Sequence, residues 1–166
     1  MDVNQFYGFF STTCLALVGL WWGVVDRRRD LLVDPDRRRE VGAVYLTFLL
    51  PGLMGLLAQV GGTENPAIWR ISFVVIAVVG AVTTVLVLDV AAREGGGLIP
   101  RLRWAIAALY GIVAGLGAAP EIAESIGLTG LQAEAMLLVL LVAVGHGLVW
   151  SFLSRPAGTR TPGGPA

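Results

Sequence analysis

Long apolar stretches separated by short charged segments dominate the sequence. A hydrocarbon core of ~30 Å needs about 20 apolar residues in a helix, and unpaired backbone groups are too costly in lipid for other open structures. The pattern therefore predicts an all-α integral membrane protein with five transmembrane helices. The predicted helices are 6–25, 41–60, 71–90, 102–118 and 132–153, of which the fourth is the shortest.

The composition supports this class. Hydrophobic residues make up 55% of the 166 residues and charged residues 14%, with a mean hydropathy of +0.74. Soluble domains carry about a quarter charged residues, so this chain could not solvate its own surface. Soluble enzymes, nucleic-acid-binding proteins and disordered chains are therefore excluded. We expect one transmembrane domain over 1–153 and, over 154–166, a Pro- and Gly-rich disordered cytoplasmic tail.

The arginines predict the orientation. Nearly all of them fall in 26–40, 93–103 and the tail, which lie on one side of a chain with five crossings, whereas the opposite side has Arg70. By the positive-inside rule the N-terminus is outside and the C-terminus cytoplasmic. The first stretch is preceded by Asp2 and no arginine, which is typical of a retained helix rather than a cleaved signal peptide. We expect a multi-pass protein of the cell membrane.

The first cytoplasmic segment contains two arginine trios, each flanked by acids four residues apart, a spacing that favours helical ion pairs. Asp34 followed by Pro35 is typical of a helix N-terminus, because an aspartate caps the first turn and proline fits the first helical position. The second helix is thus expected to begin before its apolar stretch.

Cofactor and catalytic chemistry find little support. The chain has one histidine, His146, and one cysteine, Cys14. A haem held by two imidazoles or a zinc site of the Cys/His type needs more ligands than these. No H-E-x-x-H or G-x-S-x-G motif is present, and no span holds paired aspartates. We expect neither an enzyme nor a bound cofactor or metal.

Two ionisable side chains inside predicted helices are functional candidates. His146 lies past the midpoint of the fifth helix, between Gly145 and Gly147, which allow another backbone to approach. An imidazole titrates near physiological pH, so His146 is a candidate for proton relay or gating, and the alternative is a structural histidine. Asp89 is an ion-path candidate one turn from the cytoplasmic end of the third helix, or a local ion pair with Arg93.

Hydroxyl groups and glycines mark helix faces. By depth, Thr47, Thr83, Thr84 and His146 are expected to line one cavity in the inner half of the membrane. Hydroxyls can equally bond a carbonyl one turn back or a neighbouring helix. Two small-xxx-small pairs predict close helix crossings, within one chain or between chains. These pairs are Gly19 with Gly23 and Gly111 with Gly115.

The outer face is acidic. Its acids outnumber Arg70, and such a mouth attracts cations. The alternative is that selection for positive charge inside left ordinary loop acids. The expected outer-mouth acids are Glu64, Glu121, Glu124 and Glu134.

Together these features predict a homo-oligomeric channel or transporter for a small cation or protons, embedded in the lipid bilayer. The alternative is a non-catalytic accessory or scaffold subunit that packs against another membrane protein through its glycine faces. Neither reading involves nucleic acid.

Overall fold

The computed structural model describes residues 2–61, 65–93 and 98–153, without the side chains of 36, 87–93, 98–103 and 151. The described residues form helices and no strand. Each of the five predicted stretches lies inside one helix, so the prediction of helical structure is confirmed for all of them. The elements are α1 (Val3–Arg27), η1 (Arg29–Leu32), α2 (Pro35–Gly61), α3 (Pro66–Arg93), α4 (Leu98–Ala118), α5 (Glu121–Glu124) and α6 (Gly130–Leu153).

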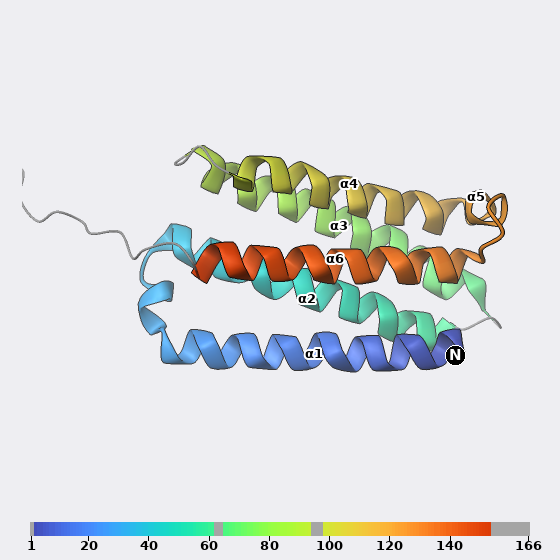
Figure 1. The fold of residues 1–166 in the computed structure, drawn as a ribbon, viewed down its shortest axis with the longest axis horizontal. Coiled ribbons are helices and arrows are strands. Elements are labelled where there is room, and N and C mark those ends of the chain that lie inside the picture. Colours follow the sequence, from blue (N-terminus) through green and yellow to red (C-terminus); the bar gives the residue numbers. More distant parts are fainter. Residues whose placement is uncertain (1, 62–64, 94–97, 154–166) are drawn as a thin grey trace, which may run out of the picture.

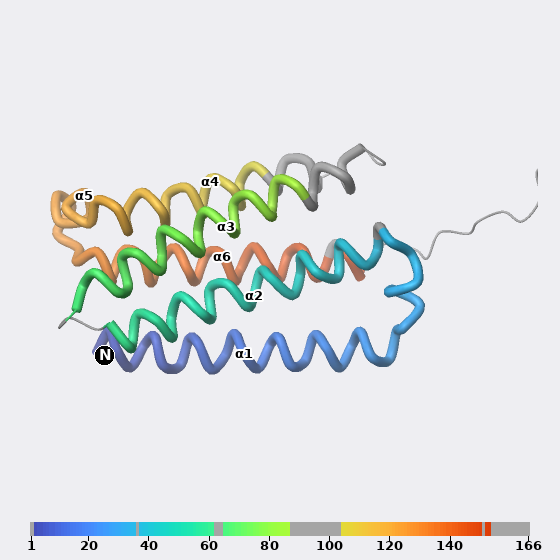
Figure 2. The backbone as a smooth tube through the Cα atoms, turned by 180° about the vertical axis from the view of Figure 1, so that it is seen from behind, coloured from blue at the N-terminus to red at the C-terminus, as the bar shows by residue number. Residues whose placement is uncertain are grey.

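The helices form one elongated bundle in which α1 to α4 pack in chain order, each against the next (Figure 1). Helix α6 packs against α1, α2 and α4. Figures 1 and 2 place the start of α1 and the short α5 at one end of the bundle, hereafter the α5 end. The η1 segment and the last turns of α6 lie at the opposite end, the η1 end. The tail over 154–166, expected to be disordered, lies outside the described residues.

The helix ends follow the local sequence. Asp2 caps α1 by accepting a hydrogen bond from the Asn4 backbone N–H at 3.3 Å. Helix α2 begins at Pro35, directly after Asp34, as predicted. Gly127 has φ +77°, a left-handed conformation open to glycine, and turns the chain between α5 and α6.

Helix α2 is the central helix of the bundle. Of the 18 consecutive residues that form its most apolar part, 56% are buried, against 22% in the corresponding parts of α1 and α3. Large apolar side chains also cover the outside of the bundle, for example Phe9, Ile71 and Trp150, which are 64%, 65% and 76% exposed. A helix that is apolar on every side belongs in a large core or in a membrane.

Among the residues that the structure describes, four helices are long and apolar enough to cross a membrane: Val3–Arg27, Arg37–Gly61, Pro66–Leu86 and Gly130–Trp150. In the described part of the chain α4 adds a shorter apolar segment, Trp104–Ala118. The structure is therefore an all-helical bundle of the kind found in membranes.

Candidate functional site

Glu134 is a fully buried carboxyl on α6. Its side chain is 0% exposed, and neither carboxyl oxygen has a hydrogen-bond partner among the described residues. The expectation of a water-exposed acid at an outer mouth is therefore wrong for this residue. The physical reason is helical spacing, because Leu131, Glu134, Leu138 and Leu141 recur every three or four residues and form one buried stripe of α6.

Tyr7 on α1 is the polar neighbour of this carboxyl. Tyr7 is 0% exposed, and its hydroxyl donates a 2.8 Å hydrogen bond to the Leu131 carbonyl oxygen on α6. The phenol and the Glu134 carboxyl are close enough for a charge on one to affect the other. A long side chain in a helix leans toward the preceding turn, so the Glu134 carboxyl extends toward the turn that Tyr7 contacts. We call Glu134 and Tyr7 the carboxyl site; it lies at the α5 end of the bundle.

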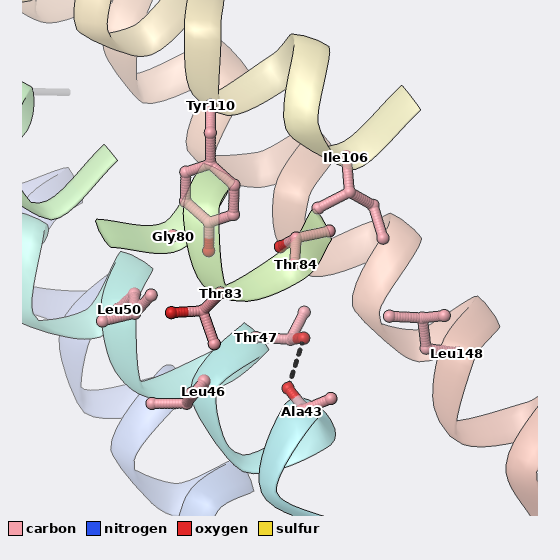
Figure 3. Close-up of a pocket in the computed structure, with 10 residues that line it drawn as sticks. All are labelled: Ala43, Leu46, Thr47, Leu50, Gly80, Thr83, Thr84, Ile106, Tyr110 and Leu148. Atoms are coloured by element: carbon pink, nitrogen blue, oxygen red, sulfur yellow. Dashed lines mark hydrogen bonds between the residues drawn. The ribbon is translucent and has the colours of Figure 1, made fainter. Parts of the chain in front are cut away.

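A second polar region lies nearer the η1 end. Figure 3 shows a cavity between α2, α3, α4 and α6 that is bordered by the hydroxyl-bearing Thr47, Thr83, Thr84 and Tyr110. Its volume of about 20 Å³ is room for about one water molecule. The sequence-based grouping of the three threonines is confirmed. Their part in an ion path stays a prediction, and Tyr110 is an addition that sequence reasoning missed.

Two residues shape this hydroxyl cavity. A Cβ on Gly80 would lie 2.6 Å from the Tyr110 ring, so glycine lets the ring lie against the backbone of α3. Pro51 lies inside α2 and lacks the N–H that would otherwise bond the Thr47 carbonyl one turn back. Separately, the Thr47 hydroxyl donates to the Ala43 carbonyl oxygen at 2.8 Å, as Figure 3 shows.

His146 does not join the hydroxyl cavity, contrary to expectation. Its side chain is exposed on the outer surface of α6, and its Nδ1 lies 2.9 Å from the Val142 carbonyl oxygen one turn back. The ring packs edge-on to Phe48, with centroids 5.3 Å apart. These contacts agree with a structural histidine. The flanking glycines differ: a Cβ on Gly145 would lie 2.5 Å from Thr47 Cγ2, whereas one on Gly147 would meet no atom within 4 Å.

Two of the remaining candidates lie outside both regions. Glu121 and Glu124 are exposed on α5. Glu64 and the side chain of Asp89 lie outside what the structure describes. Groups of three or more metal-ligating side chains are absent from the described residues.

The two small-xxx-small pairs make no close crossing inside the chain. A Cβ on any of their four glycines would meet no atom within 4 Å. The close crossing of α1 and α2 instead uses Gly52, whose Cβ would lie 3.0 Å from Cys14 Cβ, and Gly55, which lies against Ser11. All four glycines of these pairs are exposed, Gly19 and Gly23 on α1 and Gly111 and Gly115 on α4.

Arg70 joins α3 to the end of α4. Its Nε donates to the Gly117 carbonyl oxygen at 3.1 Å, and its Nη2 to the Ala118 carbonyl oxygen at 2.7 Å. The last carbonyls of a helix have no partner in the helix itself, so Arg70 satisfies groups that would otherwise stay unpaired.

Comparisons of the chain with protein-family models, curated proteins and solved structures found no match.

Proposed function

We propose that the protein translocates protons across a membrane, through the interior of a bundle whose five long helices all cross it. The proposed orientation has the α5 end outside and the η1 end in the cytoplasm. The arginine distribution supports this orientation. The 21 residues of α4 support a fifth crossing, since about 20 residues reach across a hydrocarbon core.

The observation that carries the proposal is the buried carboxyl of Glu134, which has no hydrogen-bond partner in the described part of the chain. An ionised carboxylate in an apolar interior costs several kcal/mol unless a counter-charge or hydrogen bonds compensate it. The group is therefore neutral at rest and becomes charged when its proton leaves. Such a residue inside a membrane helix is by default a functional hypothesis, with proton relay among its common roles.

The hydroxyl cavity favours protons over larger cations. Its volume of about 20 Å³ holds about one water molecule, which is too little for a cation with a hydration shell. Hydroxyl groups both donate and accept hydrogen bonds, so the cavity side chains and one water can pass a proton along a chain. The cavity is the proposed inner station, and the carboxyl site is the proposed outer station.

An apolar barrier separates the two stations. Leu138 and Leu141 follow Glu134 on the buried stripe of α6 and are 0% and 1% exposed. The rise from Glu134 to Leu141 is about 10 Å along the helix. A hydrophobic constriction blocks a proton path while it is dry and opens the path when water enters it. We therefore propose that proton translocation is regulated and that the pore is not permanently open.

The test is proton flux into liposomes that hold the purified protein and a pH-sensitive dye, driven by a potassium diffusion potential. We expect flux above that of empty liposomes, and we expect Glu134→Gln to reduce it to the empty level, because the amide keeps the shape but cannot exchange the proton. Glu121→Gln, an exposed acid at the same end, is the matched control and should keep the flux. Wild-type flux equal to empty liposomes rejects the proposal, and normal flux in Glu134→Gln removes the residue from it.

A second candidate is an accessory or scaffold subunit, which the outward glycine pairs favour. Small residues on lipid-facing helices let another helix approach closely. The same faces support the homo-oligomer expected of a channel. Mass measurement in nanodiscs separates these: a multiple of the chain mass that Gly111→Leu reduces to a monomer supports the homo-oligomer. A monomer without proton flux supports the accessory role.

A further inference from the structure

An open groove runs along α3 beside the end of α4. Its volume is about 370 Å³, and its walls are apolar except for Arg70. The α3 residues that line it recur every three or four positions, from Ala67 at the α5 end to Val75 deeper in the bundle. The rise from Ala67 to Val75 is about 12 Å, more than a third of a ~30 Å hydrocarbon core. Ile71 and Val75 are 65% and 55% exposed, so the groove faces outward.

Arg70 places a positive charge near the shallow end of this groove. Two of its N–H groups bond carbonyls at the end of α4. A guanidinium has five N–H donors, so three stay available to a further acceptor. Phosphate oxygens match this planar set of donors, and the carbonyl bonds already hold the guanidinium in place.

Acids adjoin the same end of the groove. Glu121 follows three residues after Ala118, whose carbonyl Arg70 binds, so its Cα is within about 11 Å of that residue. Glu121 and Glu124 are both exposed. The groove therefore presents a cation beside anions, above an apolar channel.

We propose that this groove binds one acyl chain of a zwitterionic phospholipid with a primary amine, a phosphatidylethanolamine, with its phosphate on Arg70 and its ammonium group toward Glu121. An anionic head group would meet repulsion from the neighbouring acids, and a quaternary ammonium has no N–H to donate to them. The inference rests on α3 crossing the membrane and is independent of proton translocation.

The test is native mass spectrometry of the purified protein titrated with phosphatidylethanolamine, phosphatidylglycerol or phosphatidylcholine of the same acyl chains. We expect phosphatidylethanolamine to be retained roughly two- to fivefold better than the others, the range of an exposed charge pair. Glu121→Gln should abolish this preference and leave overall retention intact. Equal retention of all three lipids, or stronger retention of phosphatidylglycerol, overturns the proposal.

Two variants separate binding from folding. Arg70→Gln should reduce lipid retention about tenfold, and Arg38→Gln, at the other end of the bundle, is the control for the lost charge. The Arg70→Gln substitution also removes the hydrogen bonds to the end of α4, so a second variant is needed. Val75→Trp fills the groove and leaves Arg70 intact, so it should also reduce retention. Unchanged lipid retention in a folded Val75→Trp variant overturns the proposal. A mass spectrum in which a second copy of the chain, and no lipid, is bound to the protein overturns it as well.

Discussion

One methyl group added at Gly145 tests the crossing of α6 and α2. A Cβ there would lie 2.5 Å from Thr47 Cγ2, whereas carbon atoms in favourable contact are about 3.5–4.0 Å apart. Overpacking of this kind costs about 1–3 kcal/mol, and alanine regains about 0.5–1 kcal/mol over glycine through its better helix preference. We therefore expect Gly145→Ala to lower the free energy of unfolding by about 1–2 kcal/mol.

The measurement is unfolding in mixed micelles, followed by tryptophan fluorescence. Gly147→Ala is the matched control, because it lies on the same helix and its Cβ would meet no atom within 4 Å. It should be as stable as the wild type or slightly more stable. Thr47→Ser removes the methyl group that clashes, so the double variant with Gly145→Ala should recover most of the loss. Equal stability of the two alanine variants, or no recovery in the double variant, would refute the geometry.

Three further predictions use other contacts. Trp21→Phe loses a 3.1 Å hydrogen bond to a carbonyl of α2 and should cost about 1 kcal/mol of unfolding free energy, while Trp22→Phe, half exposed, should cost little. The Cys14 thiol is 1% exposed, so a maleimide should label it after denaturation and not before. The Arg28 guanidinium hydrogen-bonded to Asp30 lowers the pKa of that carboxyl. The ion pair therefore stabilises the fold at neutral pH, and this contribution is lost as the pH falls through the lowered pKa. Carboxyl NMR should show a higher pKa for Asp30 in the Arg28→Gln variant.

Much of the helical structure could be predicted because apolar length is a strong signal. The stretch 41–60, for instance, lies inside α2 (Pro35–Gly61), and the start of that helix at Pro35 follows from its local sequence. The first two predicted helices are too short because the count of apolar residues stops where charged residues begin. The backbone stays helical beyond that point, as in α1, which ends at Arg27. Apolarity thus indicates the part of a helix that lipid can surround, and the helix itself runs further.

The faces of the helices could not be predicted in the same way. When all sides of a helix are apolar, hydropathy does not show which side packs inward. Gly145 and Gly147 both adjoin His146 in sequence, yet Gly145 is buried and Gly147 is exposed. Depth along α6 favoured His146 over Glu134 as the functional residue inside the bundle. In the structure Glu134 is buried and His146 is exposed. The spacing of Glu134 among leucines was the signal available, because it puts the acid on the stripe that also holds Leu138.

The hydroxyls of α1 explain why the carboxyl of Glu134 is the exceptional group. Ser11, Thr12 and Thr13 each donate to the carbonyl oxygen four residues back, at 2.8, 2.9 and 2.8 Å, so they need no other partner. An ionised carboxylate has no hydrogen to donate, and neither oxygen of Glu134 accepts a hydrogen bond from a described residue. A protonated carboxyl has one O–H and can bond a carbonyl as the hydroxyls do. Taking up a proton therefore removes the uncompensated charge of Glu134. Binding a metal cation would instead need several ligands, and the described residues hold no group of three or more His, Cys, Asp or Glu side chains that could supply them.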